Sequence, residues 1–149
     1  MRRPSVEDTL LIQDLYARYA WALDTGDTDA YAELYAPDAV VYENRPEGLR
    51  RADGREQIRE FVMRFHADPG FPGRQHRTSQ LMILPDPQGR EDRWRARSYV
   101  LTTEFKDGGP PTLFWCGHVD DILVKHGDEW LIERREIKPW AGDVLERFA

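Results

Sequence analysis

The first part of the chain repeats apolar residues at helical spacing. Between Ser5 and Asp24 they recur every third or fourth position, the period of a helix with one buried face. Ser5 followed three residues later by Asp8 resembles a capping box, so the helix begins there. Gly26 can adopt the left-handed conformation that closes a helix. The pattern therefore predicts one long helix that ends at Asp24-Thr25-Gly26.

Two shorter helices are expected after it. Asp27 can cap a second helix over residues 28–35, which ends near Pro37. Gly54 introduces a third helix over residues 55–66. The apolar residues on one face of this third helix are Ile58, Phe61, Val62 and Phe65.

The rest of the chain has the alternating pattern of strands. Residues 39–43 are predicted to form a strand, and residues 44–53 a polar loop or irregular hairpin. After a loop at residues 68–73, four strand-like runs are separated by short segments rich in turn residues, which favours antiparallel hairpins. The four runs are 76–84, 92–105, 112–124 and 129–138. Helices followed by a meander predict one α+β domain over residues 1–149, with a cavity between the first helix and the sheet.

Alternation also predicts which side chains share a face. In the run 92–105, Tyr99 is expected to point outward, and the inward residues are expected to be Trp94, Ala96, Ser98, Val100 and Thr102. In the last strand Arg135 should share a face with Leu131, Glu133 and Ile137. The period does not decide whether that face is the cavity.

Composition narrows the class of protein. The chain has 149 residues, 40% of them hydrophobic, which excludes global disorder. Its net charge of −6 argues against a nucleic-acid or anionic-membrane partner. A single cysteine, Cys116, excludes an internal disulfide and a Cys-based metal cluster. Without an apolar run of about 18 residues or a leader-like apolar segment, a cytoplasmic protein is expected.

No cofactor or metal is expected from the motifs. The sequence lacks HxH and HExxH, and its glycine-rich segments do not lead from a strand into a helix. It also lacks the GxSxG motif of a serine nucleophile. The arginines of residues 90–97 alternate along one strand and are interpreted as a polar outer face.

Asp24 and His76 are the main candidates for catalytic residues. Asp24 lies in the last turn of a helix, where the dipole disfavours a negative charge, so it is either a solvated carboxylate or a perturbed one. His76 opens a strand after a Gly/Pro loop, as a surface residue or at a cavity mouth. If the two pair, His76 can act as a general base. His118 is a rival on the face shared with Cys116 and Asp120, whereas His66 and His126 are interpreted as surface residues.

Several motifs in a fixed order resemble one family. They are IQDLYARYAWALD at residues 12–24, GDTD at 26–29, LYAPDAV at 34–40, GREQI at 54–58, HVDD at 118–121 and GDEWLI at 127–132. Over about residues 6–140 the chain is similar to the SnoaL-like branch of the nuclear transport factor 2-like superfamily. The resemblance implies a cone-shaped, cystatin-like barrel of one curved antiparallel sheet with three N-terminal helices on its concave face.

Within that branch the motifs look like those of scytalone dehydratase, the bile-acid dehydratase and hexachlorocyclohexane dehydrochlorinase. The catalytic residues implied by the resemblance are Asp24, His76, Tyr19 and Arg135. The substrate-binding residues expected beside them are Tyr16, Phe61, Phe65, His118 and Trp115.

The function implied is a cofactor-independent lyase that uses an Asp–His dyad on a small, cyclic, largely apolar substrate. An isomerase or polyketide-type cyclase would use the same dyad. A small-ligand-binding protein or a dioxygenase β-subunit-like protein would use the fold without catalysis. The family also implies a homo-oligomer, dimer or trimer.

Overall fold

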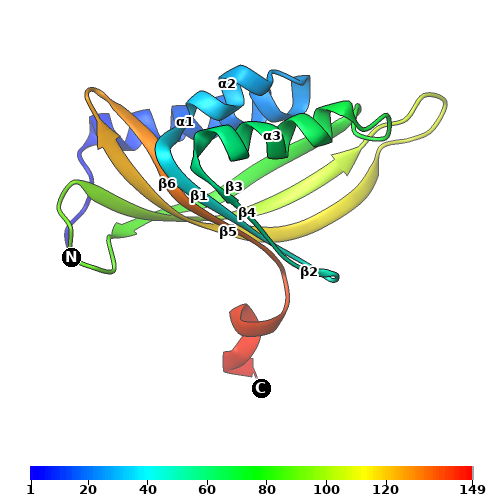
Figure 1. Ribbon diagram of the computed structural model, residues 1–149. Helices are drawn as coiled ribbons and strands as arrows, with labels where there is room; N and C mark the ends of the chain where they lie inside the picture. The colour runs from blue at the N-terminus through cyan, green and yellow to red at the C-terminus, as the bar shows by residue number, and fades with distance from the viewer. Residues whose placement is uncertain (149) are drawn as a thin grey trace.

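A computed structural model describes residues 1–148 and shows three helices lying over one face of a curved sheet (Figure 1). The helices are α1 (Val6–Thr25), α2 (Thr28–Glu33) and α3 (Gly54–Ala67). The strands are β1 (Tyr35–Arg45), β2 (Gly48–Asp53), β3 (Arg74–Pro85), β4 (Arg93–Glu104), β5 (Thr112–His126) and β6 (Glu129–Pro139). A short 3₁₀ helix, η1 (Gly142–Phe148), follows β6 and lies away from the helical layer. The α+β class predicted from the sequence is confirmed.

Local signals determine where α1 begins and ends. The Ser5 side chain accepts a hydrogen bond of 3.0 Å from the Asp8 N–H, as the capping pattern predicts. Gly26 has a φ of 82° and donates its N–H to Ala22, so it closes the helix in the left-handed conformation. This closure leaves Asp24 in the final turn, where its side chain can reach β3.

The sheet is mixed rather than entirely antiparallel. Its order is β2-β1-β6-β5-β4-β3, and β1 pairs in parallel with β6. Of the two forms expected for residues 44–53, a polar loop or an irregular hairpin, the structure shows a hairpin, because β2 pairs antiparallel with β1. Among the described residues the sheet does not close into a barrel, since β2 and β3 form its two edges. The three helices cover the concave face of this open sheet (Figure 1).

A β-bulge in β6 changes the faces predicted for that strand. Ile122 pairs with Arg134 and Leu123 pairs with Ile132, so Glu133 is the extra residue. The bulge places Ile132 on the same face as Arg135, and it turns Glu133 outward. The expectation that Glu133 shares the face of Arg135 was therefore wrong. Strict alternation cannot reveal an inserted residue.

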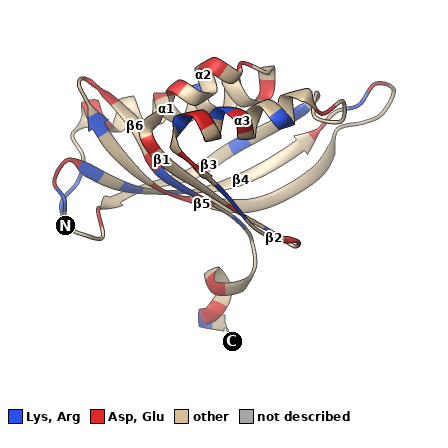
Figure 2. Ribbon diagram, in the orientation of Figure 1, with Lys and Arg blue, Asp and Glu red and all other residues tan. Residues whose placement is uncertain are grey.

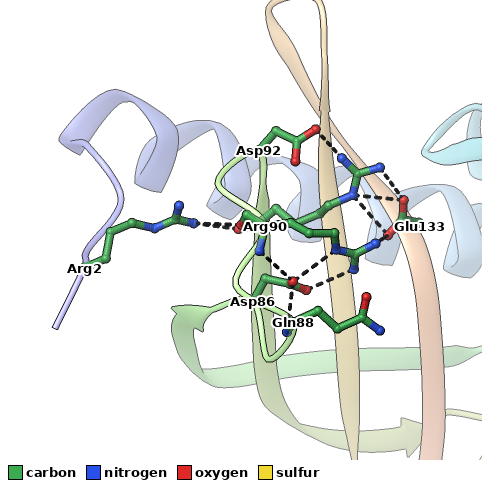
Figure 3. A network of polar contacts seen from close by, with 7 residues as sticks. Arg2, Asp86, Gln88, Arg90, Asp92 and Glu133 are labelled. Carbon is green, nitrogen blue, oxygen red and sulfur yellow. Dashed lines mark hydrogen bonds and ion pairs between the residues drawn. The ribbon is translucent and has the colours of Figure 1, made fainter.

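Glu133 instead joins a charged network on the outer side of the sheet (Figure 3). It accepts hydrogen bonds from Arg93 at 2.8 and 3.1 Å and lies 3.4 Å from Arg90. The buried Asp86 accepts from the Arg90 side chain at 3.0 Å and from the backbone of Arg90 and Gln88 at 3.1 Å. The hydrogen bond from the Arg90 side chain lowers the pKa of Asp86. The network therefore fixes both the β3–β4 loop and the bulge.

The faces predicted for β4 are confirmed. Trp94, Ala96, Ser98, Val100 and Thr102 are buried, and Tyr99, on the other face, is exposed. Positive and negative side chains are interspersed along the helices and strands (Figure 2). None of the helices in residues 1–148 is long and apolar enough to cross a membrane.

Candidate functional site

A cavity of about 640 Å³ lies between the helices and the concave face of the sheet. Its walls are mainly aromatic and aliphatic, with polar groups confined to a few positions. The apolar lining includes Tyr19, Leu23, Tyr31, Phe61, Phe65, Phe71, Val100, Phe114, Trp115, Val119 and Ile137. The charged or titratable lining residues are His76, Arg135, Glu43, Arg45, Glu47, Asp68 and Arg74. Such a cavity fits a largely apolar ligand with a few polar groups.

Asp24 and His76 form a hydrogen-bonded pair beside this cavity. The Asp24 Oδ1 atom lies 2.5 Å from His76 Nδ1, and Oδ2 accepts the backbone N–H of His76 at 2.8 Å. An ionised carboxylate only accepts hydrogen bonds, so Nδ1 carries the proton and Nε2 is the acceptor. These two bonds offset the unfavourable position of a negative charge at the end of α1. His76 itself lines the cavity, so the dyad can serve a ligand there.

His66 holds the elements around this pair. Its Nε2 lies 2.8 Å from the carbonyl oxygen of Leu23, and its Nδ1 lies 2.8 Å from the Thr28 hydroxyl. Because a carbonyl only accepts, Nε2 donates and Nδ1 accepts from Thr28. The ring of Phe71 lies between His66 and His76, 5.6 and 6.1 Å from them. The interpretation of His66 as a surface residue was wrong, since it joins α3 to the end of α1 beside Asp24.

A buried ion pair lies under the cavity. Arg135 binds both oxygens of Asp121, at 2.9 and 2.7 Å, and the two side chains are 1% and 0% exposed. The Tyr16 hydroxyl also donates to Asp121. Burial, followed by the charge of Asp121, raises the pKa of Tyr16 well above its usual value, so Tyr16 remains protonated. Burial opposes the charge of Arg135, but the charge of Asp121 outweighs it and raises the pKa of Arg135.

One nitrogen of Arg135 has no polar partner in the described part of the chain. Its Nη1 is buried and has no hydrogen-bond partner among residues 1–148. The guanidinium lies 4.0 Å from the centre of the Tyr19 ring, which fixes its plane. A buried donor without a partner costs about 1–3 kcal/mol.

The structure brings most of the predicted site residues to one cavity. His76, Tyr19 and Arg135 line it, and Asp24 lies directly behind His76. The predicted substrate-binding residues that also line it are Phe61, Phe65 and Trp115.

Tyr16 and His118 are not lining residues, which corrects their expected placement. Tyr16 is directed to Asp121 beneath the cavity. His118 is buried on the outer side of β5, 5.7 Å from the Trp140 ring, because Val119 and Asp121 occupy the inner side.

Sequence reasoning missed two residues of the site. Asp121 holds Arg135, but only the β5–β6 register, which pairs these two residues, shows it. Tyr31 lines the cavity, contacts Tyr19 at 5.2 Å between ring centres, and accepts a 2.9 Å hydrogen bond from Tyr35. Within the part of the chain that the structure describes, no three His, Cys, Asp or Glu residues gather as metal ligands would.

Comparisons with solved structures agree with this architecture. A cystatin-like protein of unknown function from Nostoc punctiforme is 25% identical, with a TM-score of 0.75 over 93% of this chain and 95% of that chain. ActVI-ORFA from Streptomyces coelicolor is 24% identical, with a TM-score of 0.75 over 88% and 96% of the two chains. A protein named "Putative Scytalone Dehydratase" from Novosphingobium aromaticivorans is 24% identical, with a TM-score of 0.71 over 88% and 83%. At these identities the last two likenesses show the fold.

The family itself is shown by the sequence. No curated protein matches the chain significantly. The SnoaL-like domain, however, matches residues 4–136, which is most of the chain and includes Asp24, His76 and Arg135. The resemblance expected from the motifs is therefore confirmed, and the chain belongs to the SnoaL-like domain family, with a cystatin-like fold.

Proposed function

We propose that this protein is a cofactor-independent lyase of the dehydratase type, acting on a small, cyclic, largely apolar substrate. The observation that carries the proposal is the Asp24–His76 pair, with Nδ1 bound to the carboxylate at 2.5 Å. Nε2 is then the one ring nitrogen able to accept a proton, and the ring lines an apolar cavity. A fixed tautomer at such a position is what a general base requires.

The proposed reaction is an elimination of water next to a carbonyl group. His76 Nε2 removes a proton from the carbon beside the carbonyl, and the electron pair moves into the carbonyl to give an enolate. The enolate then reforms the carbonyl and expels the hydroxyl from the neighbouring carbon. The imidazolium returns its proton to that hydroxyl, which leaves as water. A general base of this kind contributes about 10²–10⁴-fold to the rate.

Arg135 and Tyr19 are proposed to stabilise the oxygens that change charge. Arg135, which lines the cavity, donates to the developing enolate oxygen, and Asp121 holds the guanidinium in place. A donor placed this way contributes about 10²–10³-fold. The Tyr19 hydroxyl is the second donor, for the enolate or for the departing hydroxyl. The apolar walls strengthen each of these interactions by excluding water.

The name of one structural neighbour, "Putative Scytalone Dehydratase", supports water elimination as the reaction. The same dyad would also serve an isomerase or a cyclase. The exposed Tyr99 and Leu101 on the outer face of β4 support the assembly of a homo-oligomer through the sheet.

The test uses 3-hydroxy-1-tetralone, a bicyclic β-hydroxy ketone that becomes 1-naphthol when it loses water. The wild-type protein should form 1-naphthol, measured by its fluorescence, and His76→Ala should lower kcat by about 10²–10⁴-fold. Arg77→Ala is the matched control, because Arg77 is exposed on the next position of the same strand. Circular dichroism checks that both variants fold.

Equal rates for His76→Ala and the wild type would contradict the proposal. So would a wild-type protein that forms no naphthol. If deuterium from D₂O enters the carbon beside the carbonyl without naphthol formation, the dyad acts as the base of an isomerase instead of a lyase.

A further inference from the structure

We infer that the substrate carries a carboxylate, or an equivalent anionic group, and that Arg74 binds it at the mouth of the cavity. The inference rests on the proposed function in that it takes this cavity as the substrate site. It adds the chemical class of the ligand and a specificity-determining residue outside the dyad.

Arg74 occupies a defined position next to the dyad. It is the first residue of β3, two positions before His76, and both side chains line the cavity. Alternate residues of a strand are about 7 Å apart on one face. The guanidinium lies 4.1 Å from the centre of the Phe114 ring and 5.3 Å from that of Phe71. These two aromatic rings hold its position.

The partners of the cavity arginines distinguish Arg74 from the other two. Arg135 is paired with Asp121, and Arg45 contacts both carboxylate oxygens of Glu43 at 2.9 Å. Arg74 has no carboxylate within 4 Å in residues 1–148, and its Nε is buried without a hydrogen-bond partner. Among the arginines that line the cavity, Arg74 alone lacks a carboxylate partner.

Two acids near Arg74, Asp68 and Glu104, have other partners. Asp68 also lines the cavity, and its Oδ1 accepts the Gly70 N–H at 2.8 Å. Glu104, opposite Arg74 on β4, contacts Lys106 at 2.9 Å. A partly desolvated guanidinium without a counter-ion is unfavourable. Its planar fork matches a carboxylate, which can accept two hydrogen bonds from it.

The three polar groups together define the ligand. In the proposed function, His76 removes a proton from a carbon of the ligand, and Arg135 binds the reacting oxygen. Arg74 then holds the acidic group towards the Phe114 end of the cavity. The substrate class is therefore a cyclic carboxylate in which an apolar ring separates the acid from the reacting carbonyl.

Binding of two matched probes tests this inference without requiring turnover. 2-Naphthoate and 2-naphthamide have the same ring and nearly the same shape, but only the first carries a charge. Isothermal titration calorimetry should show that the wild-type protein binds 2-naphthoate about ten-fold or more tightly than the amide, a difference of about 1.4 kcal/mol. In Arg74→Gln the preference should fall to about two-fold or less. Arg77→Gln, on the outward side of the same strand, should keep it.

Equal affinity of the wild type for the two probes would overturn the inference, as would no binding of either. A preference that survives in Arg74→Gln would assign the guanidinium to packing against Phe114. Circular dichroism and urea unfolding confirm that Arg74→Gln folds, and Arg74→Lys, which keeps the charge, should retain part of the preference.

His76→Ala separates this inference from the proposed function. If the dyad is not catalytic, His76→Ala keeps its turnover, yet the preference for 2-naphthoate still depends on Arg74. If the dyad is catalytic but the ligand is uncharged, His76→Ala loses turnover and Arg74→Gln leaves the relative affinities unchanged.

Discussion

At the scale of single residues, two aspartates accept hydrogen bonds from the groups that they orient. Asp24 binds the Nδ1 and the backbone N–H of His76, and Asp121 binds Arg135 and Tyr16. Each carboxylate fixes the orientation of a group that faces the cavity. The first fixes the tautomer of a histidine, and the second fixes the plane of a guanidinium.

His118, on the outer face of the sheet, allows a prediction about how the stability of the protein depends on pH. Burial, followed by the charges of Arg97 and Lys138, lowers the pKa of His118 below the usual 6.5. The folded protein therefore binds a proton at His118 less readily than the unfolded chain. Stability from the neutral ring is complete above about pH 6.5 and is lost as the pH falls below that value. An NMR titration should place the midpoint of His118 below 6.5.

Arg97→Gln is the matched variant for that titration. Removing the positive charge should move the His118 midpoint upward, because a nearby cation disfavours the imidazolium. A midpoint at or above 6.5 in the wild type, or no upward movement in Arg97→Gln, would contradict the described environment.

At the scale of elements, local signals were enough to predict most of the fold. The ends of α1 follow from Ser5 and Gly26, and the long strands follow from alternation and turn residues. The parallel pairing of β1 with β6 could not be predicted in this way, because it joins segments about 90 residues apart. Nor could the bulge at Glu133, whose effect on side-chain direction depends on the register with β5.

Less of the candidate site than of the fold could be predicted from the sequence. Family motifs pointed to Asp24, His76 and Arg135, and the helix dipole made Asp24 unusual by itself. The contacts around them could not be predicted from the sequence, because Asp121 binds Arg135 and His66 binds Leu23 through tertiary hydrogen bonds. His66 does follow Ile58 and Val62 at four-residue spacing on α3, a pattern that indicates the buried face.

His66 joins α3 to the end of α1, and replacing it tests how much these hydrogen bonds stabilise the protein. His66→Ala removes hydrogen bonds to Leu23 and Thr28, and leaves their polar groups without these partners. The free energy of unfolding should fall by about 1–3 kcal/mol. Urea unfolding measures this change, with His126→Ala at the exposed end of β5 as the control, expected within about 0.5 kcal/mol of the wild type. Equal losses for both variants would contradict the structural role of His66.

At the scale of the whole molecule, an open, curved sheet and three helices enclose one apolar cavity. Among its polar groups, His76 and Arg135 are held by aspartates that do not line the cavity, and Arg74 is held by aromatic rings. This arrangement agrees with the SnoaL-like family to which the chain belongs. It supports a site where the protein's own side chains move protons in a water-poor environment.

The central claim is that His76, oriented by Asp24, removes a proton from carbon in this cavity. Deuterium exchange into the carbon beside the carbonyl of 1-tetralone tests it most directly, because 1-tetralone has no leaving group and exchange reports proton removal alone. In D₂O, mass spectrometry should show wild-type exchange about 10²-fold or more faster than with His76→Ala. Exchange at the same rate with both proteins would contradict the claim.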